Sequence, residues 1–246
     1  MKKIKVGIVN YLNTRPMLYG LEHAPVKDQI DFMPDYPANV AGDLIEGRSD
    51  IGLVPVAVIP KLKEWSLVGD FCIGCDGPVS SVCLFSETPL EQVKTVLLDY
   101  HSRTSTELAR ILLREHWKKE VEFVHAAPGY RDHIKGNTAG LVIGDECFEQ
   151  RKISPYIYDL GEAWKKHTGM PFVFAAWVSN KSLDPSFIQD FNEANAYGVN
   201  HIPEVIASIG PYDLYDLQTY YARDMSYNLD ESKKKALAMF LERISG

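Results

Sequence analysis

Cysteine is scarce in this chain, with four residues among 246, and their spacings do not form the paired pattern of a disulfide framework. We therefore expect free thiols and a reducing compartment. Cys72 and Cys75 form one C-x-x-C, but neither a second pair nor a thioredoxin-like helix accompanies it. We interpret this pair as incidental rather than as a redox motif.

Long apolar runs are also absent. No run approaches the length of a membrane span, and Lys5 and Asn10 interrupt the first apolar stretch before it reaches the length of a signal-peptide core. These absences predict a cytoplasmic protein that does not enter the membrane.

The common motifs of cofactor and metal chemistry are missing. The sequence has no G-x-G-x-x-G, no P-loop and no G-x-S-x-G elbow, which excludes the familiar nucleotide-binding and hydrolase classes. The seven histidines show neither H-E-x-x-H nor H-x-H spacing. A metal site therefore has no support in the sequence, and no familiar cofactor motif is present.

Positive charge is in the minority. Twenty-six Lys and Arg residues against 33 Asp and Glu residues give a net charge of −7, which argues against nucleic acid or an anionic membrane as a partner. An anionic small molecule would need a locally positive pocket. The length, with 46% hydrophobic residues, fits one large or two small globular domains.

Strand-like and helix-like segments alternate along most of the chain, which predicts an α/β protein with mainly parallel sheets. The expected strands span residues 4–9, 30–33, 51–54, 68–73, 79–85, 93–99, 121–124, 140–143, 155–160 and 171–178. From Asp184 onward the apolar spacing is helical. We predict two lobes with a cleft between them: residues 1–82 plus 179–246, and residues 83–178.

Three of the expected strands run into polar segments, at residues 10–15, 77–81 and 101–105. In open α/β sheets, ligands bind at the carboxyl ends of the strands. The third segment places Ser102, Thr104 and Ser105 at a helix N-terminus beside Arg103, which favours a carboxylate. The alternatives are that the first segment is an ordinary polar turn and that Thr104 only caps its helix.

Two further positions have more than one interpretation. Asp145 follows a short apolar strand and is a candidate acid, base or helix cap, with the cap the commonest role. Phe172 and Phe174, with Trp164 and Trp177, either form the wall of an aromatic pocket or belong to the core.

Several ordered blocks together form a specific pattern: residues 11–16, 50–56, 77–82, 98–99 with 102–105, 144–145, 159–161 with Trp164, and 168–169 with 171–175. These blocks resemble the chorismate dehydratases of menaquinone biosynthesis by the futalosine route. The resemblance covers most of the chain through about Trp177 and is weak in the helical tail. The departures are Cys72, Cys75 and His101, which leave a thiol-dependent or histidine-assisted variation open.

The resemblance implies a two-lobed fold like the type 2 periplasmic binding proteins, with the active site in the interlobe cleft. It implies a lyase that removes water from chorismate, without a metal or organic cofactor, to give 3-[(1-carboxyvinyl)oxy]benzoate. The tail either covers the cleft or forms a homodimer interface. The predicted catalytic residues are Asn13, Ser80, Ser81 and Asp145, and the predicted substrate-binding residues are Tyr11, Thr14, Arg15, Gly77, Pro78, Ser102, Arg103, Thr104, Ser105 and Phe172.

The base that would remove the ring proton stays open between Asp145, His101, Asp99, Asp76 and a carboxylate of the substrate itself. Two other functions are compatible with the same fold. One is a non-catalytic small-anion binding protein, since fold alone does not fix function. The other is the sister enzyme, 1,4-dihydroxy-6-naphthoate synthase, whose members open with a Ser-Pro-Cys-Pro-Asn-type loop that is not present here.

Overall fold

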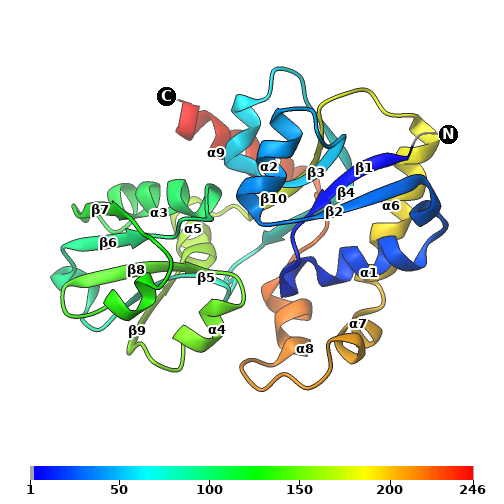
Figure 1. The fold of residues 1–246 in the computed structure, drawn as a ribbon. Coiled ribbons are helices and arrows are strands. Elements are labelled where there is room, and N and C mark those ends of the chain that lie inside the picture. The colour runs from blue at the N-terminus through cyan, green and yellow to red at the C-terminus, as the bar shows by residue number, and fades with distance from the viewer. Residues whose placement is uncertain (1–2, 246) are drawn as a thin grey trace.

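The computed structural model describes residues 3–245, and these form two lobes, each built around a five-stranded sheet (Figure 1). The first sheet has the order β2-β1-β3-β10-β4 and the second the order β7-β6-β8-β5-β9. The strands are β1 (Ile4–Ile8), β2 (Ile30–Pro34), β3 (Ile51–Pro55), β4 (Ser66–Cys75), β5 (Val82–Ser86), β6 (Thr95–Leu98), β7 (Glu122–His125), β8 (Thr138–Ile143), β9 (Tyr156–Asp159) and β10 (Phe172–Ser179).

Helices cover both sheets. In the first lobe α2 packs on β1 and β3, α6 on β4, and α9 on β10, whereas α3, α4 and α5 pack in the second lobe (Figure 1). The helices are α1 (Arg15–His23), α2 (Pro37–Ile45), α3 (Thr104–Glu115), α4 (Glu146–Gln150), α5 (Leu160–Thr168), α6 (Pro185–Val199), α7 (Ile202–Ile209), α8 (Leu217–Thr219) and α9 (Glu231–Ser245). The predicted α/β, two-lobed architecture is confirmed.

Both sheets are mixed rather than mainly parallel. β1 pairs in parallel with β2 and β3, but β10 runs antiparallel between β3 and β4. The second sheet repeats this plan, because β5 runs antiparallel between β8 and β9. In each sheet, therefore, one strand runs antiparallel to the other four.

The position of β10 corrects the predicted lobe boundary. Residues 83–178 were expected to form the second lobe, yet β10 belongs to the first sheet, so the chain returns before Phe172 rather than near Val178. An apolar strand that is buried on both faces has the same sequence pattern in either sheet, because its partners are not encoded in its periodicity.

Two glycines set the position of α1. A Cβ atom at Gly20 would overlap the carbonyl oxygen of Ala194, and one at Gly198 would overlap the carbonyl oxygen of Pro16. Helices α1 and α6 therefore approach backbone to backbone, and this contact fixes the helix that follows the first polar segment.

Within residues 3–245, no helix is long and apolar enough to cross a membrane.

Candidate active site

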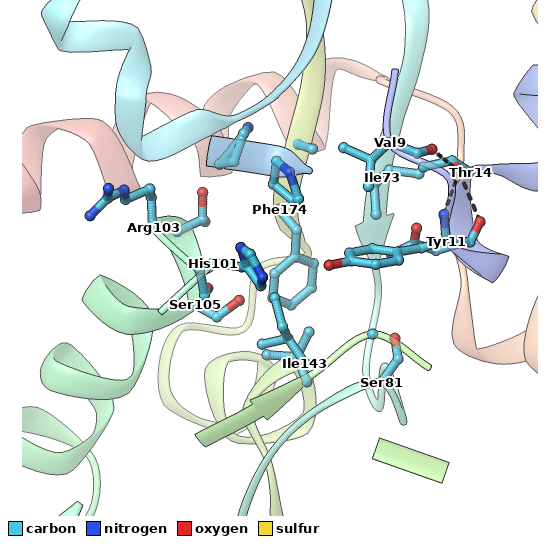
Figure 2. Close-up of a pocket in the computed structure, with 18 of the residues that line it drawn as sticks. Val9, Tyr11, Thr14, Ile73, Ser81, His101, Arg103, Ser105, Ile143 and Phe174 are labelled. Atoms are coloured by element: carbon cyan, nitrogen blue, oxygen red, sulfur yellow. Dashed lines mark hydrogen bonds between the residues drawn. The ribbon is translucent and has the colours of Figure 1, made fainter. Parts of the chain in front are cut away.

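A pocket lies between the two lobes and encloses about 660 Å³ of empty space, including the part that is open to solvent. Its walls combine the ends of β1, β3, β4 and β10 from the first lobe with the start of α3 and the end of β8 from the second (Figure 2). The lining residues are Val9, Tyr11, Asn13, Thr14, Pro37, Leu53, Pro55, Ile73, Val79, Ser81, Val82, His101, Ser102, Arg103, Thr104, Ser105, Ile143, Gly144, Phe174 and Ala175.

The segment after β1 contributes an aromatic hydroxyl and an amide. The ring of Tyr11 points across the pocket toward Phe174 and His101 (Figure 2), and burial raises its pKa, so the hydroxyl keeps its proton. The side-chain oxygen Oδ1 of Asn13 is buried and has no hydrogen-bond partner among residues 3–245. A buried acceptor without a partner costs free energy, and a ligand that donates a hydrogen bond would remove this cost.

Thr14 has a local structural role. Its hydroxyl Oγ1 lies 2.5 Å from the carbonyl oxygen of Val9 and accepts a hydrogen bond from the Tyr11 N–H at 3.3 Å. These bonds close the turn before α1, so the Thr14 hydroxyl holds the loop in shape rather than reaching freely into the pocket.

Asp145 connects the lobes instead of lining the pocket. Its carboxylate accepts the Leu12 N–H at 3.1 and 3.4 Å, across 133 positions in the sequence. Burial raises the pKa of Asp145 to about 6, although the Leu12 N–H and the positive charge of Arg15 oppose this rise. The role that this geometry gives Asp145 is to hold the first loop against the second lobe.

The raised pKa predicts a specific pH dependence of stability. Between about pH 4 and pH 6 the folded protein keeps a proton on Asp145 that the unfolded chain has released, so this group's contribution to stability falls as the pH rises through that window. Asp145→Asn keeps an acceptor for Leu12 without the buried charge. We therefore expect the difference in urea midpoint, variant minus wild type, to increase from about pH 4 to about pH 7.

Asp213→Asn is the matched control for that comparison, because it removes one exposed carboxylate by the same substitution. A difference in urea midpoint between Asp145→Asn and the wild type that does not change with pH, or that moves in favour of the wild type as the pH rises, would contradict the raised pKa of Asp145. Unfolding by urea at a series of pH values measures it directly.

The start of α3 provides the positive end of the pocket. The carboxylate of Asp99 accepts the N–H groups of His101 at 2.8 Å and Ser102 at 3.0 Å, which fixes the loop before the helix. The N–H groups of the first turn of α3 have no partner within the helix, and a helix N-terminus favours a carboxylate.

The structure rules out the capping alternative for Thr104 and places Arg103 at the pocket edge. Thr104 does not cap the helix, since α3 begins at Thr104 and its N-cap, Arg103, makes no side-chain cap bond. Instead the Thr104 hydroxyl accepts the Ala57 N–H at 3.2 Å and so joins the lobes. Arg103 lines the pocket edge, but its guanidinium extends away from the rings of Tyr11 and Phe174 (Figure 2).

An aromatic contact joins the lobes at the side of the pocket lined by Pro37. The ring of Tyr36, from the first lobe, stacks on His101 of the second lobe with centroids 4.7 Å apart and planes 5° from parallel. Tyr100 lies against the same imidazole at 4.0 Å. His101 therefore lines the pocket and also contacts the first lobe through Tyr36.

Residues 77–81, where the chain passes from β4 in the first lobe to β5 in the second, place two neighbouring serines in different surroundings. The Asp159 carboxylate accepts the N–H groups of Val79 and Ser80, and Ser80 takes a left-handed conformation with φ of 62°. The Ser80 hydroxyl lies 3.0 Å from that of Tyr215 and does not line the pocket, whereas Ser81 does.

The pocket thus brings together eight of the fourteen predicted site residues: Tyr11, Asn13, Thr14, Ser81, Ser102, Arg103, Thr104 and Ser105. Six others do not line it: Arg15, Gly77, Pro78, Ser80, Asp145 and Phe172.

Phe172 is a core residue rather than a pocket wall. Its ring lies 5.1 Å from Trp164, 5.0 Å from Phe240 and 4.7 Å from Phe174, and it is 1% exposed. The pairing of β10 with β4 shifts register between Val173 and Ala175, so alternation along the strand does not decide which aromatic ring reaches the pocket. Phe174 takes that place.

Sequence reasoning missed the hydroxyl groups of the tail. The helical spacing of Tyr220 and Tyr221 indicated a buried apolar face, but the Tyr220 hydroxyl bonds Ser81 at 2.9 Å and the Tyr221 hydroxyl bonds the Leu12 carbonyl at 2.8 Å. A run of tyrosines where leucines would serve equally well is the signal that could have indicated this role.

No group of three or more His, Cys, Asp or Glu side chains is placed to hold a metal ion in the described part of the chain. The four cysteines are free and buried.

Comparison with solved structures defines the fold. The chain is similar to a crystal structure from Archaeoglobus fulgidus, with a TM-score of 0.74 at 15% identity, over 99% of this chain and 96% of that one. It is also similar to the periplasmic aliphatic sulphonate binding protein of Escherichia coli, with a TM-score of 0.67 at 13% identity, over 100% of this chain and 91% of that one. The fold is therefore that of the periplasmic binding proteins.

The sequence comparisons identify the family. Residues 4–245 match the family described as menaquinone biosynthesis, and the chain belongs to it. It is 25% identical to the chorismate dehydratase of Thermus thermophilus, over 99% of this chain and 96% of the relative. It is 23% identical to the chorismate dehydratase of Campylobacter jejuni, over 96% of this chain and 95% of the relative.

Proposed function

We propose that this protein is a chorismate dehydratase, a lyase that eliminates water from chorismate to give 3-[(1-carboxyvinyl)oxy]benzoate in menaquinone biosynthesis. The family and the two relatives support this activity. The observation that carries it is the pocket, which is lined by the N-terminus of α3 from one lobe and by Asn13 from the other. A cytoplasmic location and a homodimer remain predictions.

Chorismate has two carboxylates and one ring hydroxyl, and the pocket offers a partner for each kind of group. We assign one carboxylate to the first turn of α3, where Ser102 and Ser105 add hydroxyls to the free N–H groups. The unpartnered Oδ1 of Asn13 suits the ring hydroxyl, which donates a hydrogen bond. Ser81 lines the same pocket and adds a hydroxyl for the departing oxygen.

The reaction removes the hydrogen at the ether-bearing ring carbon and expels the neighbouring hydroxyl, so that the ring becomes aromatic. We infer that a carboxylate of chorismate takes the proton and then passes it to the departing hydroxyl oxygen, which leaves as water. Of the described residues that line the pocket, none carries a carboxylate. Asp145 is engaged by Leu12 and Asp99 by the loop before α3, so catalysis rests mainly on positioning.

The remaining acidic candidate is also engaged elsewhere. Asp76 pairs with Lys165 at 2.5 Å and does not line the pocket. His101 does line the pocket and is the side chain whose removal tests the substrate-assisted mechanism.

The first experiment incubates purified, metal-stripped protein with chorismate and follows the products by chromatography and mass spectrometry. We expect loss of one water with the enolpyruvyl group retained, and we expect His101→Ala to keep turnover. Loss of turnover in His101→Ala, with chorismate still bound, would move the base from the substrate to the histidine. Unchanged chorismate with folded wild-type protein would favour the sister synthase or a small-anion binding protein.

A further inference from the structure

The C-terminal tail holds two of the three polar segments of the pocket, residues 10–15 and 77–81, through buried tyrosine hydroxyls. Tyr227 donates to the Asn13 carbonyl at 2.9 Å, and Tyr221 donates to the Leu12 carbonyl at 2.8 Å. Tyr220 reaches the other loop, where its hydroxyl donates to the Ser81 Oγ at 2.9 Å. The segment that follows α8 lies against the start of α1 in Figure 1, where these bonds form.

A π-helical turn over Tyr220–Asp224 directs neighbouring tyrosines to different loops. Its far end is fixed, because the buried carboxylate of Asp224 accepts hydrogen bonds from Tyr215 at 2.7 Å and Arg223 at 2.8 Å. Single π-turns are rare and are frequent at functional sites. This turn therefore belongs to the construction of the pocket rather than to a separate tail.

The bond from Tyr220 differs from the others because it ends on a side chain that lines the pocket. Tyr220 is 0% exposed, and burial holds its pKa well above the usual value, so its hydroxyl keeps the proton that it donates to Ser81. The Ser81 hydrogen must then point elsewhere. Its acceptor within the described chain is the Val79 carbonyl at 3.4 Å, which is long for an O–H···O bond.

We propose that Tyr220 is a positioning residue that makes Ser81 a hydrogen-bond donor toward the ligand. In the proposed dehydration, on which this inference rests, the oxygen that receives this bond is the ring hydroxyl that leaves. Negative charge develops on that oxygen as its bond to carbon breaks, so the hydrogen bond from Ser81 strengthens in the transition state. The bond from Tyr220 polarises Ser81 and makes it a better donor.

Tyr220→Phe tests this role because it removes only the hydroxyl from a buried ring. We expect kcat to fall about tenfold while KM changes less than about twofold, since the lost polarisation acts mainly in the transition state. Tyr158→Phe is the matched control, because its hydroxyl bonds the Leu90 N–H at 2.7 Å in the second lobe, away from the pocket. We expect its kcat to equal that of the wild type.

A double-mutant cycle with Ser81→Ala separates positioning from general loss of structure. If Tyr220 acts through Ser81, Tyr220→Phe has no further effect on kcat once the Ser81 hydroxyl is absent. An unchanged kcat in Tyr220→Phe, or a tenfold loss that persists in the Ser81→Ala background, would overturn the proposal.

This experiment distinguishes failure of the dehydratase assignment from failure of the proposal about Tyr220. Wild-type protein that leaves chorismate unchanged would reject the proposed function, and the same four proteins would then be compared by their Kd for chorismate, measured by calorimetry. Positioning by Tyr220 predicts the same non-additive pattern in Kd, and additive effects there would reject it.

Discussion

Replacing Asn13 by Ala is expected to lower kcat for chorismate dehydration by roughly 100-fold, because the ring hydroxyl loses the acceptor that orients it. The side-chain oxygen of Asn13 is buried in the pocket and has no partner among residues 3–245, so the ligand is its natural partner. The Tyr227 hydroxyl holds the Asn13 backbone, and it remains in the variant. Initial rates over a range of chorismate concentrations give kcat and KM separately.

Asn200→Ala is the control for this measurement, since Asn200 is exposed at the end of α6. A rise in KM with kcat preserved would mean that Asn13 contributes to ground-state binding alone. The unfolding midpoint of Asn13→Ala should stay near that of the wild type, because removing an unpartnered buried acceptor takes no internal hydrogen bond away.

Replacing Gly20 by Ala destabilises the protein by about 3 kcal/mol, because the new Cβ would overlap the Ala194 carbonyl oxygen of α6 and the two helices would have to move apart. The shift would also displace the Tyr11–Thr14 turn directly before α1, so we expect kcat to fall with stability. Urea unfolding followed by circular dichroism, together with the product assay, measures both effects.

Gly42→Ala is the matched control, because Gly42 lies within α2 and no atom lies within 4 Å of the position that its Cβ would take. We expect a gain of about 0.5–1 kcal/mol there, since alanine restricts the unfolded chain and favours the helix. Equal changes in the free energy of unfolding for Gly20→Ala and Gly42→Ala would show that α1 and α6 can move apart without a loss of stability. That result would contradict the close approach described above.

The sequence by itself determined the local elements and the position of two of the polar loops. Each expected strand has its counterpart in β1 to β10, because strand formation follows from short apolar runs bounded by turn residues. The loops that hold Asn13 and Ser102 to Ser105 do meet at one pocket. This agreement follows from a general property of α/β sheets, in which strand ends of one lobe converge on the ligand.

Contacts between distant segments were decided only by the tertiary structure. Periodicity shows that β10 is buried but not which sheet takes it, and it shows that Phe172 and Phe174 are apolar but not which one reaches the pocket. It likewise leaves Ser80 and Ser81 equivalent, whereas the bonds from Asp159 and Tyr220 give them different positions.

The tail shows this division most clearly. Tyr220 and Tyr221 have the spacing of a helix face, and both are buried. The hydroxyls of Tyr220, Tyr221 and Tyr227 nevertheless bond residues that lie 139, 209 and 214 positions earlier in the chain. A local pattern specifies burial because burial depends on one residue and its near neighbours, whereas the partner of a buried hydroxyl depends on how the whole chain packs.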